Sequence, residues 1–112
     1  MPSKGKAKGS AGERSVVKAF REAGWVGAER TRAGWQDDRG DIDGVLGVTL
    51  EVKNQKRMDL AQWVDELIVE MRNGDNDVGA VVHKRVGKTD AADWYASMPL
   101  YVYMHLLKQA GY

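Results

Sequence analysis

Three segments of the chain carry apolar residues at the three- and four-residue spacing of a helix. The first runs from about residue 11 to residue 23. The second begins after Asp59 and ends at Asn73-Gly74, and the third begins at Pro99, a residue that suits the first turn of a helix. The apolar positions of the three stripes are Val16, Val17, Phe20 and Ala23; Leu60, Trp63, Val64, Leu67, Ile68 and Met71; and Leu100, Tyr103, Met104 and Leu107.

The segments between these helices read as short strands separated by turns. Residues 33–39 are mostly polar and contain glycine, so they are predicted to form a loop. The order of elements is α-β-β-β-α-β-β-α, which predicts an α/β fold with a mixed sheet flanked by helices. The predicted strands cover residues 25–32, 41–46, 48–54, 78–82 and 93–98.

The length and the charge pattern suggest one domain with a basic extension. The chain has 112 residues, enough for a single domain with a modest core. Lys4, Lys6 and Lys8 precede the first acidic residue, in a segment rich in glycine and serine. We therefore expect residues 1–9 to be a flexible basic arm, either a nucleic-acid contact or a solubilising tail, and residues 10–112 to form the domain.

Several classes of function are excluded by composition. The chain has no cysteine, which rules out disulfides and thiolate metal sites. It has no apolar run as long as a membrane span and no signal-peptide pattern. It has no glycine-rich phosphate loop, and His83 and His105 lack the spacing of a metal-ligand pair. We therefore expect a cytoplasmic protein that makes no membrane contacts and uses no small-molecule cofactor.

Charged side chains gather on the two predicted strands at the middle of the chain. Asp41 and Asp43 lie on the first, and Gly47 predicts a tight hairpin before the second. Alternate strand residues point to the same side, so Glu51 and Lys53 share a face while their apolar neighbours face the core. Carboxylates brought together across the hairpin would suit a divalent cation and a phosphate. The alternative is a solvated strand face preceded by ordinary turn aspartates.

The pattern Asp-(x)9-Glu-x-Lys after an amphipathic helix resembles the motif of the PD-(D/E)xK nuclease superfamily. More narrowly, the chain resembles the archaeal Holliday-junction resolvases and their short phage-encoded relatives over about residues 5–110. Gly40 stands where the superfamily motif has proline. The resemblance implies a restriction-endonuclease-like core. The matching segments are residues 8–14, 24–25, 29–32, 40–42 and 50–53.

This resemblance implies roles for the charged residues. Asp41 and Glu51 would be direct ligands of Mg²⁺, with Mn²⁺ as a substitute, and the backbone carbonyl of Val52 would be a further ligand. Lys53 would orient or deprotonate the attacking water and stabilise the negative charge of the phosphate. Metal ions can supply the remaining chemistry of phosphodiester hydrolysis.

Two acidic residues keep alternative roles at this point. Glu13 forms a Ser-x-x-Glu capping box with Ser10 at the predicted helix start, and the resemblance also implies that Glu13 completes the metal site. Asp43 either assists or replaces Asp41, or a bulge turns it away. The resemblance favours Asp41, because its spacing to Glu51 is the one that the phage-encoded relatives show.

Basic residues around the hairpin are candidates for contacts with DNA phosphates. Gln55, just past Lys53, would add a polar contact. Binding of this kind is electrostatic and independent of sequence, and no predicted helix offers a surface for reading bases. The predicted DNA-binding residues are Lys4, Lys6, Lys8, Arg30, Arg32, Gln55, Lys56, Arg57, Lys84, Arg85 and Lys88.

These features predict a Mg²⁺-dependent endonuclease that resolves four-way junctions in DNA recombination and repair, in the host cytoplasm if the chain is phage-encoded. A junction has two symmetric strands to cut, so we expect a homodimer. Its interface would use the second helix, the third helix or an adjoining strand edge. The alternatives are the same nuclease chemistry on a restriction- or repair-type substrate, or a catalytically inactive DNA-binding protein.

Overall fold

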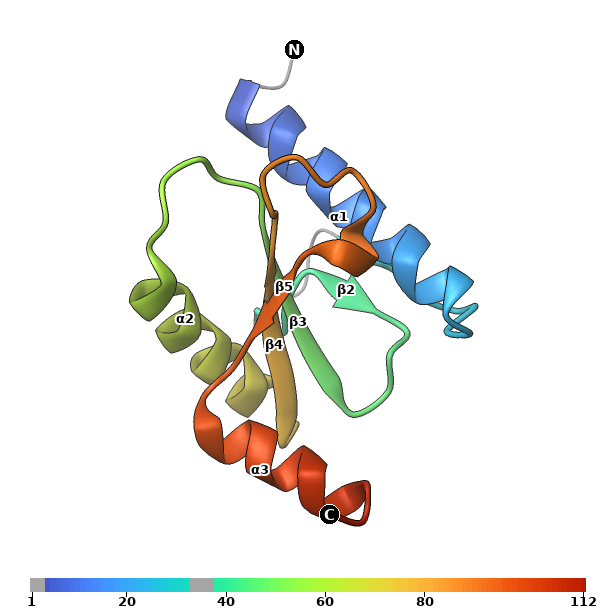
Figure 1. Ribbon diagram of the computed structural model, residues 1–112, viewed down its shortest axis with the longest axis vertical. Helices are drawn as coiled ribbons and strands as arrows, with labels where there is room; N and C mark the ends of the chain where they lie inside the picture. Colours follow the sequence, from blue (N-terminus) through green and yellow to red (C-terminus); the bar gives the residue numbers. More distant parts are fainter. Residues whose placement is uncertain (1–3, 33–37) are drawn as a thin grey trace.

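The computed structural model describes residues 4–32 and 38–112, and its elements follow the predicted order (Figure 1). The predicted α/β class is confirmed: a mixed sheet is flanked by three helices. Most of the predicted loop at 33–39, and the first three residues of the predicted arm, lie outside the described residues. The elements are α1 (Lys4–Glu22), β1 (Glu29–Arg30), β2 (Ile42–Asp43), β3 (Val48–Lys53), α2 (Leu60–Asn73), β4 (Val78–His83), the 3-10 helix η1 (Ala91–Asp93), β5 (Tyr95–Ser97) and α3 (Leu100–Gln109).

The sheet has two parts. In the larger part β3 runs parallel to β4, from the pair Val48↔Val78 onward, and β4 pairs antiparallel with β5. In the smaller part β1 pairs antiparallel with β2, with Arg30 opposite Ile42. The predicted hairpin between the second and third strands is therefore wrong, because β2 forms its ladder with β1.

The first and last predicted strands are shorter than expected for local reasons. Residues 25–27 belong to a turn after α1, where the N–H of Trp25 donates to the carbonyl of Phe20. The predicted strand 93–98 is replaced at its start by η1. Asp90 caps η1, because its Oδ1 accepts a 2.9 Å hydrogen bond from the N–H of Ala92.

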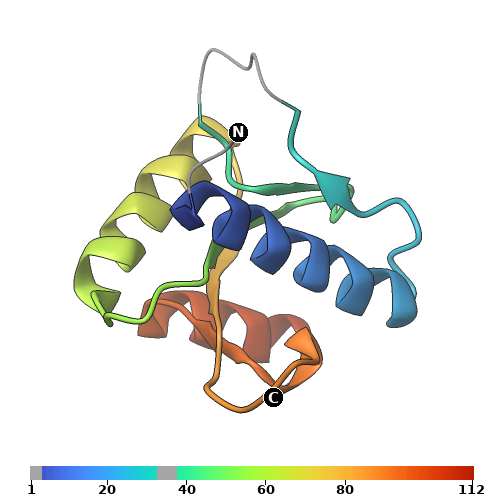
Figure 2. The ribbon, with the colours of Figure 1, turned by 90° about the horizontal axis from the view of Figure 1, so that it is seen from above.

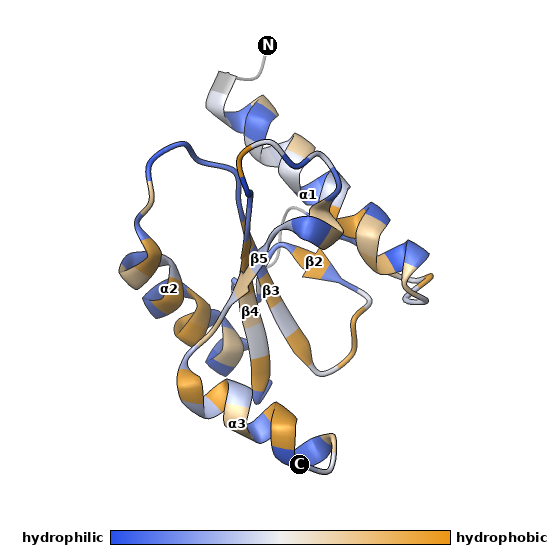
Figure 3. Ribbon diagram, viewed as in Figure 1, coloured by the Kyte–Doolittle hydropathy of each residue, from blue (hydrophilic) through white to orange (hydrophobic). Residues whose placement is uncertain are grey.

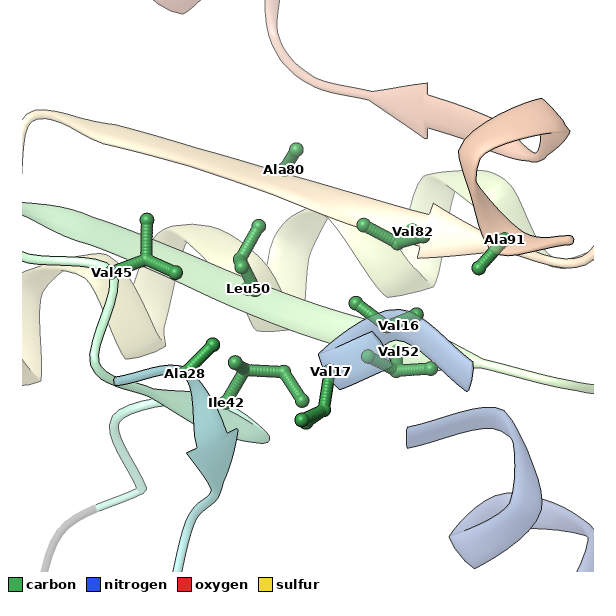
Figure 4. Close-up of a cluster of buried hydrophobic side chains, with 10 residues drawn as sticks. All are labelled: Val16, Val17, Ala28, Ile42, Val45, Leu50, Val52, Ala80, Val82 and Ala91. Atoms are coloured by element: carbon green, nitrogen blue, oxygen red, sulfur yellow. The ribbon is translucent and has the colours of Figure 1, made fainter. Parts of the chain in front are cut away.

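The core consists of two apolar clusters on opposite faces of the sheet. α1 and the β1–β2 pair cover one face, where side chains such as Val16, Leu50 and Val82 pack together (Figure 4). α2 and α3 cover the other face (Figure 2). There Leu67 and Val81 belong to the second buried cluster. Successive strand residues point to opposite faces, so Leu50 and Val52 meet α1. Glu51 and Lys53 consequently lie on the face that α2 covers.

Helix α1 starts earlier than predicted, at Lys4 instead of about residue 11. The amide of Asn54, just past β3, donates a 3.0 Å hydrogen bond to the carbonyl of Lys8. Gly12 permits this approach, because a Cβ there would lie 3.0 Å from the Cβ of Asn54. This tertiary contact holds residues that the sequence alone assigns to the flexible arm, so residues 4–9 are helical.

The expected capping box is absent for the same reason. Ser10 and Glu13 lie inside α1 and not at its start, and both contact Arg30 of β1. The Nε of Arg30 lies 2.9 Å from Glu13 Oε1, and its Nη2 donates a 3.1 Å hydrogen bond to Ser10 Oγ. These two residues therefore tie α1 to β1.

The apolar stripe of α2 is confirmed as core, with Trp63, Leu67 and Met71 buried. α3 differs, because Val102 is its buried residue, whereas Leu100, Tyr103 and Met104 of the predicted stripe are exposed and Leu107 is half-buried. Leu100 is 69% exposed and Met104 is 47% exposed, and α3 carries apolar residues at the edge of the molecule (Figure 3). Among the described helices, none combines the length and the apolar character needed to cross a membrane.

Candidate functional site

Strand β3 and helix α2 bring together acidic and basic side chains that are separated along the chain. Glu51 is buried, 7% exposed. The Nζ of Lys53 lies 3.8 Å from Glu51 Oε1 and 3.0 Å from Glu66 Oε2. Glu66 follows Trp63 by three residues and Glu70 follows Glu66 by four, so both lie on the side of α2 that faces β3. Glu51 and Lys53 therefore meet as predicted, with helix glutamates as additional partners.

Asp41 reaches the same place from the edge of β3. Its N–H donates to the carbonyl of Leu50 at 2.8 Å, and its Oδ2 accepts from the N–H of Val52 at 2.8 Å. The Asp41 side chain thus accepts a backbone hydrogen bond at the edge of β3, where β2 forms no ladder with β3. A strand residue directs its N–H and C=O to the same edge, so the carbonyl of Val52 faces this edge as well. The predicted meeting of Asp41 with Glu51 is found without the predicted hairpin ladder.

Gly40, the residue before Asp41, has a backbone conformation that favours glycine. Gly40 has φ +104°, a left-handed conformation that favours glycine, and a Cβ there would lie 2.8 Å from the carbonyl oxygen of Leu50. Proline, locked near φ −65°, could not adopt this conformation. Glycine therefore allows the chain to approach β3 closely enough for Asp41 to bond to it.

Asp43 is directed elsewhere. Its Oδ1 accepts a 3.2 Å hydrogen bond from Thr31 Oγ1, within the smaller sheet. Of the two aspartates, Asp41 is the one that contacts Glu51.

Glu13, on α1, lies near Asp41 at the edge of the site. Its negative charge contributes to raising the pKa of Asp41, although less than burial and Glu51 do. Its carboxylate is paired with Arg30, whose side chain nevertheless stays 44% exposed.

Three acidic residues of the site were not predicted: Asp38, Glu66 and Glu70. One oxygen from each of Asp38, Glu51 and Glu70 lies within 4.8 Å of the others, an arrangement that could hold a metal ion. Glu70 had a signal in the sequence, because it lies beside Leu67 and Met71 on a stripe that is otherwise apolar. Asp38 had none, because it belongs to a polar loop.

Burial changes the protonation of these carboxyl groups. It raises the pKa of Asp41 to about 8, and the charge of Glu51 adds to the shift. It raises the pKa of Glu51 to about 8, together with contact with Glu70, and it raises the pKa of Glu70 to about 7. At neutral pH the metal-free site therefore holds protons that a divalent cation would displace.

Lys53 shifts in the direction that keeps its charge. Burial alone would lower the pKa of the ammonium group, but the hydrogen bond to Glu66 and the charge of Glu51 outweigh burial and raise the pKa. Lys53 is therefore a permanent cation beside the carboxylates.

Several predicted DNA-binding residues line one groove at the ends of β3 and β4. This groove, of about 430 Å³, also contains Asn54, Met58, Val86, Gly87 and Tyr95. It adjoins the acidic site, because the N–H of Lys84 donates to the carbonyl of Lys53 at 3.1 Å. The predicted residues that line this basic groove are Lys8, Gln55, Lys56, Lys84 and Arg85.

The other predicted DNA-binding residues lie outside this groove. Lys6, Arg32, Arg57 and Lys88 are exposed, and the side chain of Lys4 lies outside the described part of the chain. His83, just past the predicted strand 78–82, ends β4 and is buried. Its Nε2 lies 2.7 Å from Ser97 Oγ, and its ring packs against Trp63.

Neither protein-family models, nor curated proteins, nor solved structures give a match to this chain.

The raised pKa values predict how stability depends on pH when metal is absent. Between about pH 4, the ordinary carboxyl value, and pH 8, the folded protein keeps protons on Asp41, Glu51 and Glu70 that the unfolded chain releases. Stability must then fall as pH rises through this window. Urea unfolding in EDTA from pH 5 to pH 8 measures it, and Glu70→Gln should flatten the fall.

Asp65→Asn, on the exposed side of α2, is the matched control and should leave the pH slope unchanged. If Glu70→Gln has the same slope as the wild type, Glu70 does not carry the proton assigned to it.

Proposed function

We propose that the protein is a Mg²⁺-dependent endonuclease that hydrolyses DNA phosphodiester bonds and that its substrate is the four-way junction. The observation that carries the chemistry is the convergence of Asp41, Glu51 and Lys53 on one edge of β3, with a basic groove beside them. The choice of the junction as substrate rests on the resemblance to the resolvases.

The donor set fits a hard divalent cation. Carboxylate and carbonyl oxygens are the ligands that Mg²⁺ prefers. Asp41, Glu51 and the carbonyl of Val52 supply them, and Glu51 Oε2 is buried with no hydrogen-bond partner among the described residues. When bound, Mg²⁺ would supply Lewis-acid stabilisation of the phosphate and an activated water.

The protein's own cation has a distinct task. Lys53 is held between Glu51 and Glu66, and its raised pKa keeps it protonated. A protonated Lys53 can stabilise negative charge on the phosphate and orient the attacking water. It cannot take a proton from that water. Glu66 then acts as a positioning residue for the ammonium group.

The catalytic assignment predicts the effect of three substitutions. Asp41→Asn, Glu51→Gln and Lys53→Met should each lower the rate of Mg²⁺-dependent junction cleavage by about 10²-fold or more, the loss expected when a positioned catalytic group is removed. Asp43→Asn is the control and should keep most activity, because its carboxylate binds Thr31. Cleavage is measured on a labelled junction with Mg²⁺ or EDTA.

A panel of duplex, flap, fork and four-way junction in the same assay decides the substrate. Preferred cleavage of the duplex would replace the resolvase assignment with a restriction- or repair-type nuclease. Binding without cleavage of any substrate would indicate a catalytically inactive DNA-binding protein.

The basic groove is proposed as the path of the DNA backbone past the site. Lys84 and Arg85 line it and are exposed. The double substitution Lys84→Ala/Arg85→Ala should weaken junction binding and lower the slope of log affinity against log salt by about 1.8, from about 0.9 per lost phosphate contact. Fluorescence anisotropy measures the junction affinity, with Glu51→Gln in every variant so that the DNA is not cleaved.

Lys18→Ala, on an exposed part of α1 outside this groove, should leave the salt slope unchanged. An unchanged slope in the double variant would show that the groove does not contact phosphates.

A two-fold dimer would supply the two sites that a junction requires. The stripe of α3 that carries Leu100, Tyr103 and Met104 faces solvent, so it is a candidate apolar surface for such an interface. We expect sedimentation equilibrium at micromolar concentration to give a dimer, and Leu100→Glu/Met104→Glu to give a monomer. Val69→Glu, at an exposed apolar position of α2, is the control and should remain dimeric. A wild-type chain that stays monomeric with junction DNA contradicts the dimer.

A further inference from the structure

The acidic site extends beyond the residues that the proposed nuclease chemistry uses. Glu70 is 5% exposed and contacts Glu51 on one side and Asp38 on the other. The three carboxylates come from separate parts of the fold: the loop before Gly40, strand β3 and helix α2. One oxygen from each lies within 4.8 Å of the others, so tertiary packing has brought together three carboxyl groups, of which Glu51 and Glu70 are buried and Asp38 is exposed.

An independent observation shows that two buried oxygens of this cluster lack a hydrogen-bond donor. Glu51 Oε2 and Glu70 Oε2 are both buried, and neither has a hydrogen-bond partner among the described residues. Lys53 does not supply one, because it approaches Glu51 through Oε1 and makes its closer contact with Glu66. A buried carboxylate oxygen without a partner is costly, and a cation would satisfy both oxygens together.

The loop that carries Asp38 is held in place for this arrangement. The amide of Asn73, at the end of α2, donates a 2.8 Å hydrogen bond to the carbonyl of Asp38. The N–H of Gly40 donates a 3.0 Å hydrogen bond to Asp38 Oδ1. Helix α2 thus both contributes Glu70 and anchors the loop that contributes Asp38, so the ligand positions are set before any ion arrives.

We propose that Asp38, Glu51 and Glu70 form a second divalent-cation site, next to the Asp41–Glu51 site, with Glu51 shared between the two. All of its side-chain ligands are carboxylate oxygens, which suit Mg²⁺ or Mn²⁺. A shared carboxylate between neighbouring ions is suited to a two-metal arrangement, in which both the attacking and the leaving oxygen are stabilised. The two-metal role rests on the proposed nuclease function, whereas binding of the ion does not.

Mn²⁺ binding to the DNA-free protein tests the site, with the metal alone as the probe. Isothermal titration and electron paramagnetic resonance should both give two Mn²⁺ per chain for the wild type, with spin coupling between the ions. Glu70→Gln should bind one Mn²⁺ and lose the coupling, as should Asp38→Asn, whose exposed position makes it the safer variant for folding. Asp41→Asn should also bind one.

Glu66→Gln is the matched control, because Glu66 lies one turn from Glu70 on the same side of α2 but binds Lys53. It should keep two Mn²⁺. One Mn²⁺ on the wild type, or two uncoupled ions that survive in both Glu70→Gln and Asp38→Asn, would overturn the proposal. Two coupled ions on a protein that cleaves no DNA would support this metal site and refute the nuclease. DNA cleavage by a chain that binds only one Mn²⁺ would support the nuclease and refute the second metal site.

Discussion

Burial of carboxyl groups between β3 and α2 is the constraint on which the rest of the structure depends. Glu51 and Glu70 are more than nine-tenths buried, and Asp41 joins them from the strand edge. Burying carboxylates costs free energy unless a proton, a counter-charge or a metal compensates for it. Apolar residues at these positions would give a more stable core, so their presence points to a chemical task for this part of the molecule.

The fold meets this constraint by assigning the two faces of β3 to different purposes. Leu50 and Val52 pack into the cluster beneath α1, which provides stability. Glu51 and Lys53, on the opposite face, meet the glutamates of α2. The site thus lies on a rigid strand held on both sides, and such support keeps catalytic or metal-binding groups in fixed positions.

The acidic and basic side chains of the site lie in two neighbouring but separate regions. The acidic cluster lies between β3 and α2, and the basic groove begins at the ends of β3 and β4, one hydrogen bond beyond Lys53. If the groove binds a DNA backbone, as proposed, the basic residues would hold the phosphates next to the carboxylates, which alone would repel them. Lys53, held by Glu66, stands where the two regions meet.

The sequence by itself determined the features that depend on local periodicity. The stripe of α2, the start of α3 after Pro99 and the order of elements follow from the spacing of apolar residues and from the proline and glycine residues between the elements. Alternation along a strand likewise placed Glu51 and Lys53 on one face, opposite Leu50 and Val52.

Only the tertiary structure decided which segments meet. The contact of Asn54 with Lys8 extends α1, β1 captures β2 in place of the predicted hairpin, and packing of α2 brings Glu66 and Glu70 to the site. The α3 stripe, with the same periodicity as that of α2, faces solvent. Periodicity identifies an apolar face, but whether another element covers that face depends on contacts between residues far apart in the chain.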